Sequence, residues 1–476
     1  MAITDYGSYD ALGLAELVVQ RDVKPSELLE EAINRAEATN PKLNAIVYKD
    51  YDNARNMAKS ELPKGPFTGV PFLLKDIMAM TTTMPTRQAS AFMPPIPWLH
   101  DSVLTAKFKQ AGLVPFGKTN VPEFGLVATT ESRLYGAAHN PWNLNHSTGG
   151  SSGGSGAAVA AGIVPMAHAN DGGGSIRIPA SCNGLVGLKP TRGRISQGPD
   201  VGEAVDGLAI DLVVSKTVRD TAAALDIASG PVEGDPYWEP PKPKSYLEAI
   251  RTPLKKLRIA IALKKLDGAA LHPDCVAAVQ QAAKICRDLG HEIEEASPSL
   301  DQTMLIPAFT ALWTGNLAAG IDTIAMLTGQ TASEDKFEGT TWGLYQAGKN
   351  VSASQYLQAK ALIQRAGRDV AKFHETYDVW ITPTLSRPPV ALGTFDMTEK
   401  NVEKAFGAQI DYVPFTAMQN ATGEPAINLP LYWNAEGLPV GTQFVGRFGD
   451  EETLLKLAAQ IEQAAPWKDR YKSVKV

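Results

Sequence analysis

Cysteine is scarce in this sequence. Its 476 residues include three cysteines, Cys182, Cys275 and Cys286, whose spacing suits neither a disulfide framework nor a zinc site. Residues 1–7 carry neither a basic run nor an apolar core, so they do not read as a signal peptide. Free thiols fit a reducing compartment. We therefore expect a cytoplasmic protein without a metal site.

One-sided charge and long apolar runs are also lacking. The 45 basic and 51 acidic residues are dispersed along the chain and give a net charge of -6. This balance favours neither a nucleic-acid surface nor a charged tail. The longest apolar stretch, residues 157–169, is interrupted by Gly162 and Pro165 and falls short of the roughly 20 residues of a membrane span. We expect a small-molecule substrate as partner, and neither nucleic acid nor membrane.

The sequence is rich enough in apolar residues, at 44%, to bury a large core, and its length alone favours two or three domains. Hydrophobic periodicity predicts strands and helices in alternation. The expected strands are residues 45–48, 68–76, 113–116, 257–263, 291–295, 379–383, 426–431 and 440–445, a further strand is expected from Val164, and residues 184–190 are expected to continue the core. The expected helical regions are 10–38, 51–60, 102–111, 217–228, 273–289, 302–375 and 451–464. This order predicts an α/β fold with a parallel or mixed sheet and helices on its faces.

Two glycine-rich stretches dominate the first half of the chain. In residues 147–156, nine of ten residues are Ser or Gly, and an apolar helix is predicted to follow from Ala157. A helix N-terminus beneath such a loop suits an anion or a nucleophile. In the second stretch, Ser175 follows three glycines, whose backbone N–H groups can turn towards one point as an oxyanion hole. A tight turn with close packing explains these glycines equally well.

Lys75 ends the predicted apolar strand of residues 68–76. Period-two alternation places it on the same face as Leu73. In apolar surroundings the pKa of a lysine falls, and the neutral amine can act as a base. Because lysines usually lie on solvated faces, Lys75 is a candidate base only.

Two other motifs suggest different chemistry. Residues 112–119 match the pattern of a phosphate-binding loop, but the residues between the glycines are themselves a predicted strand. Residues 149–153 match a nucleophile elbow, but the preceding residues 143–148 are polar rather than a buried strand. We reject the first interpretation, and a Ser-His-Asp hydrolase remains a minor alternative.

Residues 69–76, 149–155 and 171–179 together resemble the amidase signature family. They occur in the family's order, and 76 residues separate Lys75 from Ser151, with 24 more to Ser175. The resemblance spans about residues 10–465. It implies an amidase signature fold with a large mixed β-sheet covered by helices on both faces.

The resemblance also overrides the length-based domain count. It implies a single domain of residues 1–476, with a signature core at 65–192. Residues 1–62 would form an N-terminal helical segment, and residues 230–376 a mostly helical insertion that contributes to the substrate pocket.

The residue roles carried over from the family define a catalytic triad. Ser175 is the expected nucleophile, Ser151 the bridging serine after a cis peptide bond with Gly150, and Lys75 the general base. The resemblance further assigns oxyanion donors to Gly172, Gly173, Gly174 and Ser175, supporting roles to Ser152, Asp171 and Arg177, and pocket positions to Leu126, Phe309 and Trp313. No metal or organic cofactor is implied.

Finer motifs favour one branch of the family. Residues 140–144, 170–172 and 189–196 are closest to bacterial amidases of the 6-aminohexanoate-cyclic-dimer hydrolase type. We therefore expect hydrolysis of amide bonds in neutral apolar, aryl or oligoamide substrates, with esters or carbamates also conceivable, by a monomer or homodimer. The alternatives are the glutaminase subunit of a tRNA-dependent amidotransferase, disfavoured by residues 206–211, and a catalytically silent binding protein.

Overall fold

A mixed sheet of eight strands forms the centre of the computed structural model, which describes residues 5–474 and 476. Across the sheet the strands are β12 (Glu292–Glu295), β11 (Arg258–Ile261), β13 (Val379–Pro383), β15 (Pro439–Val445), β14 (Ala426–Trp433), β9 (Val186–Lys189), β10 (Ile210–Ser215) and β8 (Met166–Asp171). Strand β11 pairs in parallel with both of its neighbours, and the other pairs are antiparallel. The predicted mixed sheet is therefore confirmed.

A second sheet of three strands extends the first. Its order is β1 (Ile46–Lys49), β3 (Val114–Thr119) and β2 (Pro71–Lys75), and β2 packs beside β8 at the edge of the large sheet. All five residues of β2 are buried because both faces of the strand are covered. The phosphate-loop motif ends inside β3, where Lys118 is buried and donates to Thr86 Oγ1 at 2.9 Å. The packing of β2 against β8 brings Lys75 into the middle of the molecule.

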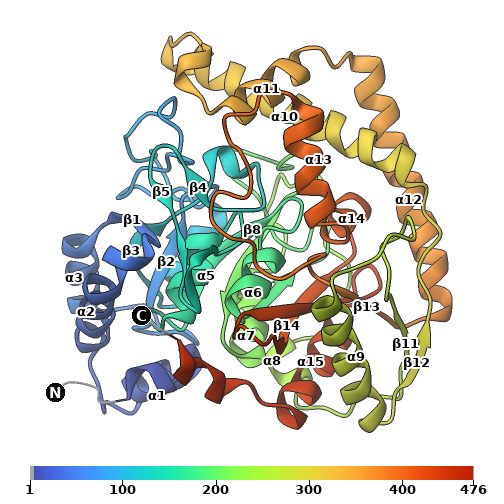
Figure 1. The fold of residues 1–476 in the computed structure, drawn as a ribbon. Helices are drawn as coiled ribbons and strands as arrows, with labels where there is room; N and C mark the ends of the chain where they lie inside the picture. Colours follow the sequence, from blue (N-terminus) through green and yellow to red (C-terminus); the bar gives the residue numbers. More distant parts are fainter. Residues whose placement is uncertain (1–4, 475) are drawn as a thin grey trace.

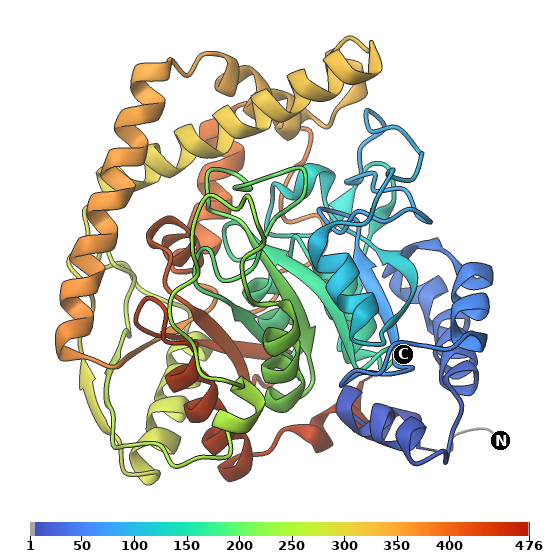
Figure 2. The ribbon, with the colours of Figure 1, turned by 180° about the vertical axis from the view of Figure 1, so that it is seen from behind.

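Helices cover both faces of the sheets. Figures 1 and 2 show α5 and α6 on one face of the large sheet and α7 on the opposite face. The helices outside residues 302–422 are α1 (Ala11–Val19), α2 (Pro25–Leu43), α3 (Tyr51–Lys59), α4 (Val103–Gln110), α5 (Gly153–Ala160), α6 (Arg177–Asn183), α7 (Val218–Ala228), α8 (Tyr246–Ala249), α9 (Pro273–Asp288) and α15 (Glu451–Ala464). Short 3-10 turns at Tyr6–Ser8, Glu123–Gly125 and Lys468–Ser473, and the two-stranded pairs β4 (Glu131–Ser132) with β5 (Gly136–Ala137) and β6 (His139–Asn140) with β7 (Asn143–Ser147), complete this part. A further 3-10 turn, Glu334–Lys336, lies within residues 302–422.

Helix α5 begins earlier than the sequence predicts. Its first residue is Gly153 rather than Ala157, so three glycines of the Ser/Gly stretch are helical. Close packing explains why these helical positions are glycines, because it leaves no room for larger side chains. A Cβ at Gly153 would lie 2.2 Å from Thr148 Oγ1, and one at Gly154 would lie 2.3 Å from the backbone nitrogen of Asn120.

Three long helices arch over one end of the sheet. They are α10 (Gln302–Thr328), α11 (Gly339–Lys349) and α12 (Ala353–Thr376), and α13 (Val402–Tyr412) and α14 (Thr416–Thr422) lie between this arch and the sheet (Figure 1). The segment 230–376 also supplies β11 and β12 to the large sheet. Helices α6, α8, α13 and α14, strand β10 and the short strands β4 to β7 were not among the predicted elements.

Helix α10 is also long and apolar enough, by length and composition, to cross a membrane. In the described residues it packs along α11 and α12, and Leu312, Leu317 and Ile321 on its inner face are buried. Helix α10 is thus packed against other helices of the fold. Its apolar character was not noted in the sequence, where residues 157–169 were identified as the longest apolar stretch.

Candidate active site

Lys75 and Ser151 meet in the interior. Strand β2 ends at Lys75, whose Nζ donates to Ser151 Oγ at 2.8 Å, and the two residues are 0% and 1% exposed. The Gly150–Ser151 peptide bond is cis, as the family resemblance implies. Ser152, the next residue, donates through its hydroxyl to the carbonyl oxygen of Asn170 at 3.3 Å.

The amine of Lys75 is held by strand β8. Its Nζ also donates to the side-chain Oδ1 of Asn170, and more weakly to the Asn170 carbonyl at 3.4 Å. Burial lowers the pKa of Lys75 to about 7, although the carboxylates of Asp211 and Asp171 raise it in part. A neutral amine, the form that can accept a proton, is therefore available near pH 7.

His168 holds the backbone of Lys75. The Lys75 N–H donates to His168 Nδ1 at 3.2 Å, and His168 Nε2 lies 3.0 Å from Asp211 Oδ1. Because Nδ1 accepts a hydrogen bond, Nε2 carries the proton and donates it to the carboxylate. Burial lowers the pKa of His168, despite the raising effect of Asp211, and the charges of Lys75 and Lys118 lower it further. A neutral imidazole therefore connects Asp211 to the strand that carries Lys75.

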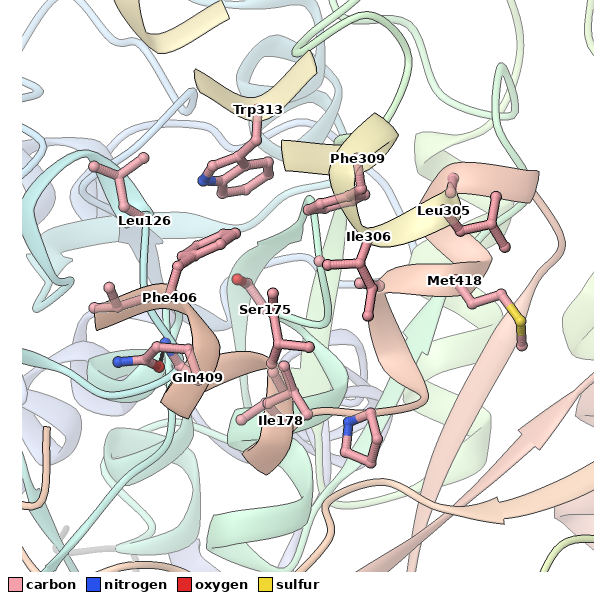
Figure 3. Close-up of a pocket in the computed structure, with 18 of the residues that line it drawn as sticks. Leu126, Ser175, Ile178, Leu305, Ile306, Phe309, Trp313, Phe406, Gln409 and Met418 are labelled. Carbon is pink, nitrogen blue, oxygen red and sulfur yellow. Dashed lines mark hydrogen bonds between the residues drawn. The ribbon is translucent and has the colours of Figure 1, made fainter. Parts of the chain in front are cut away.

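Ser175 lies beyond the end of β8, at the wall of a cavity of about 940 Å³, mouth included. Figure 3 shows its hydroxyl on the cavity side, facing the aromatic side chains of the opposite wall. The loop before Ser175 is fixed by Asp171, which accepts from Gly174 N at 2.8 Å and Ile176 N at 3.0 Å.

One expected oxyanion donor is already occupied. The N–H of Gly174 is directed at the Asp171 carboxylate rather than at the cavity, because the loop turns there with a φ of 130°. In the described part of the chain, the N–H groups of Gly172, Gly173 and Ser175 make no hydrogen bond. These three remain as candidate donors, and Gly174 is removed from the set.

Arg177 and Asp171 form a buried pair beneath this loop. Arg177 Nη2 lies 2.8 Å from Asp171 Oδ1 and both side chains are 0% exposed. The arginine lowers the pKa of Asp171 well below its usual range, against the raising effect of burial. Arg177 also donates to Gln419, Asn420 and Gln443, and Asn420 Nδ2 donates to Asp171.

Helix α14 supplies groups that sequence reasoning missed. Besides the contacts of Gln419 and Asn420, the Thr416 hydroxyl donates to the carbonyl oxygen of Gly173 at 2.7 Å. These residues lie more than 240 positions from Asp171 and Gly173, and no motif marked them. The cluster of polar side chains in the short segment 416–422 is the one local signal that could have attracted attention.

The cavity itself is apolar. None of its lining residues is Asp, Glu, Lys, Arg or His. The walls come from the loop after β3, from α10, and from α13 to α14, and the lining includes Leu126, Val127, Ile178, Leu305, Ile306, Phe309, Trp313, Phe406, Gln409, Ile410, Val413, Ala417 and Met418 (Figure 3). Leu126, Phe309 and Trp313, the three expected pocket residues, thus all lie on its wall. Among the residues that the structure describes, no group of three or more His, Cys, Asp or Glu side chains could hold a metal ion.

Comparison with known proteins agrees with this architecture. The family model described as Amidase matches residues 27–455. The chain therefore belongs to the amidase family, whose members hydrolyse carbon–nitrogen bonds of amides.

Individual relatives extend over nearly the whole chain. A 6-aminohexanoate-cyclic-dimer hydrolase of Paenarthrobacter ureafaciens is 37% identical, over 97% of this chain and 96% of the relative. A solved structure of 6-aminohexanoate cyclic dimer hydrolase with its substrate has a TM-score of 0.92 at 36% identity, covering 98% of each chain. A bacterial aryl acylamidase of the amidase signature family has a TM-score of 0.88 at 25% identity, again over 98% of each chain. The resemblance and the α/β fold expected from the sequence are both confirmed.

Proposed function

We propose that this amidase is a stand-alone serine hydrolase that cleaves neutral amides through Lys75, Ser151 and Ser175. The observation that carries the proposal is the buried hydrogen bond of 2.8 Å between Lys75 Nζ and Ser151 Oγ, beside a cavity that opens onto Ser175. A base whose pKa is near 7 suits proton transfer at neutral pH.

The proposed reaction has two halves. Ser175 passes its proton through Ser151 to Lys75 and attacks the amide carbon, and the oxyanion is stabilised by free backbone N–H groups of Gly172, Gly173 and Ser175. Collapse breaks the carbon–nitrogen bond, and Lys75 returns the proton through Ser151 to the departing amine. Water then attacks the acyl ester of Ser175 by the same route in reverse, releasing the acid and restoring the three side chains.

The cavity supports a neutral, apolar substrate. Because no ionisable side chain lines it, the charged amino and carboxylate groups of free glutamine would lose hydration there without gaining a partner. This argument disfavours a glutaminase subunit. It favours oligoamides and aryl amides, and the names of two relatives mention a cyclic dimer of 6-aminohexanoate and an aryl acylamidase. Esters and carbamates of similar shape are also within the proposal.

We also propose a cytoplasmic monomer or homodimer that acts without nucleic acid or membrane. The support is the balanced charge and the three buried thiols Cys182, Cys275 and Cys286, which suit a reducing compartment.

The test compares wild type with Ser175→Ala as isolated chains. A neutral anilide and glutamine are supplied in parallel, and product release is followed by mass spectrometry. Anilide cleavage by wild type alone is the expected result. Turnover of glutamine alone would replace the proposal with the amidotransferase subunit, and anilide cleavage that survives in Ser175→Ala would remove Ser175 from its role.

A further inference from the structure

Asn170 contacts the amine of Lys75 through both of its carbonyl oxygens. It lies on β8 and is 6% exposed. Its side chain is on the same face of that strand as the side chain of His168, two residues earlier, because side chains alternate along a strand. His168 accepts the backbone N–H of Lys75, and Asn170 accepts hydrogen bonds from Nζ. One face of β8 therefore fixes both the backbone and the side chain of the base.

The hydrogen bonds of Lys75 Nζ fill all the positions of an amine. An amine nitrogen has four tetrahedral positions, and one of them is the bond to Cε. In the described part of the chain, Nζ makes three polar contacts, with Ser151 Oγ at 2.8 Å, with the side-chain Oδ1 of Asn170, and with the Asn170 carbonyl at 3.4 Å. A neutral amine carries two hydrogens and one lone pair, so it donates to two of these oxygens and accepts from the third.

The chemistry of the three partners decides which of them donates. Both oxygens of Asn170 belong to carbonyl groups, which can only accept, whereas the hydroxyl of Ser151 can donate. The two hydrogens of the neutral amine therefore go to Asn170, and the lone pair is directed at Ser151. The orientation of the Asn170 amide agrees with this assignment, because its Nδ2 donates to the carbonyl oxygen of Ile77 at 3.4 Å while Oδ1 faces the amine.

The side chain at position 170 is also uncharged. The charged groups around the amine are the carboxylates of Asp171 on β8 and Asp211 on β10, which act at a distance, and Lys118 on β3, whose charge acts on the neutral His168. Among the described residues, the hydrogen bonds of Nζ go to uncharged oxygens only. A carboxylate in place of the Asn170 amide would pair with the ammonium form and retain its proton. The amide supplies the acceptor oxygen without that charge.

We propose that Asn170 is a positioning residue for the base: its two carbonyl oxygens take both hydrogens of the neutral Lys75 amine and direct the lone pair at Ser151. This inference rests on the proposed function and adds a residue to it. In the proton transfer, the Ser151 hydrogen moves to the lone pair of Nζ while the Ser175 hydrogen moves to Ser151 Oγ. The resulting ammonium group keeps both bonds to Asn170, so the base takes up and returns its proton without rotating.

The experiment records kcat/KM for a neutral anilide from about pH 5 to pH 10, and the decisive feature is the acidic limb, the range over which activity falls as the pH is lowered. Asn170→Asp keeps the size and the acceptor oxygen of the side chain but adds a charge in direct contact with Nζ. Its acidic limb should move by about one to three pH units to higher pH, because the carboxylate stabilises the ammonium form. Activity near pH 7 should therefore be lost and recover at the alkaline end.

Asn170→Leu is the second variant, which has a similar size but no side-chain acceptor. Its acidic limb should move to lower pH, because the ammonium form loses a hydrogen-bond acceptor. Its activity above the limb should fall about 10-fold to 100-fold, because the lone pair is no longer directed at Ser151.

Asn434→Asp is the matched control. Asn434 lies in the turn between β14 and β15, and its Oδ1 accepts from the N–H groups of Glu436 and Leu438, which an aspartate can also do. The same substitution there should keep the wild-type profile. A second readout is the rate at which a sulfonyl fluoride modifies Ser175, because this reaction uses the same base and breaks no carbon–nitrogen bond. Its acidic limb should move in the same direction as that of hydrolysis in each Asn170 variant.

The outcomes separate the two proposals. Opposite displacements of the limb in Asn170→Asp and Asn170→Leu support the inference, since a purely structural residue would lower activity equally at every pH. If both variants keep the wild-type limb, or if both limbs move in the same direction, Asn170 does not direct the base and the amidase proposal stands. If wild type cleaves no amide at any pH, both proposals are overturned. Should one variant fail to fold, the other decides, and an unchanged limb overturns the inference.

Discussion

Lys75 Nζ and Ser151 Oγ lie 2.8 Å apart in a site where neither residue is more than 1% exposed. An ammonium group without a carboxylate in direct contact is costly in such a place, so the neutral amine is favoured. The cis peptide bond before Ser151 and the end of β2 at Lys75 together establish this contact.

The first prediction concerns the pH dependence of activity. Because burial lowers the pKa of Lys75 to about 7, the proton-accepting amine predominates above that pH and is lost below it. We expect kcat/KM for a neutral amide to fall about tenfold per pH unit below pH 7 and to level off above it. The measurement is a pH–rate profile from pH 5 to 9. A profile that is flat between pH 5 and 7 would contradict the role of Lys75 as base.

The second prediction concerns Asp211 as a positioning residue. Its carboxylate raises the pKa of Lys75, as does that of Asp171, and it orients His168 through the 3.0 Å contact. Asp211→Asn should therefore move the acidic limb of the profile to lower pH, whereas a purely structural defect would lower activity equally at every pH. Asp378→Asn, which removes a carboxylate at the far side of the sheet beside β11, should leave the limb in place.

The third prediction compares neighbouring glycines. A Cβ at Gly174, where φ is 130°, would lie 2.4 Å from Thr416 Oγ1, whereas one at Gly173 would make an ordinary 3.6 Å contact with Phe309. Gly174→Ala should displace the loop of Ser175 and lower kcat by about 100-fold. Gly173→Ala should retain most of the wild-type kcat. Steady-state kinetics on a neutral anilide measure kcat for both variants. Equal losses of kcat would show that displacement of the Ser175 loop is not the reason for the effect of Gly174→Ala.

The fourth prediction concerns stability. Arg177→Met would leave the fully buried Asp171 charge without its partner and should lower the free energy of unfolding by about 3 to 5 kcal/mol. Denaturant unfolding followed by circular dichroism measures the change. Arg258→Met, which removes the half-exposed pairs with Glu292 and Glu294, should cost less than about 1 kcal/mol. Comparable losses of unfolding free energy in the two variants would mean that burial does not increase the contribution of the Arg177–Asp171 pair to stability.

Local patterns predicted much of the fold. Strands such as β2 and β13 and helices such as α9 and α15 have a clear period or a continuous apolar run, and they occur where that pattern predicted them. Helix α14 and strand β10 were missed because their polar residues, including Asn420 and Asp211, conceal the pattern. Those polar residues are buried and paired with partners far along the chain, as the contact of Asn420 with Asp171 shows.

By itself the sequence determined the family and the candidate triad, because Lys75, Ser151 and Ser175 each lie within a short motif whose residues are neighbours along the chain. Only the tertiary structure decided that the Gly174 N–H donates to Asp171 and that the Lys75 N–H donates to His168. It also decided that, among the described residues, the buried indole N–H of Trp313 has no hydrogen-bond partner. Hydrogen-bond pairing and burial depend on which distant elements pack together. Two strands can bring residues 93 positions apart into contact, and no local pattern specifies which donor such packing will leave free.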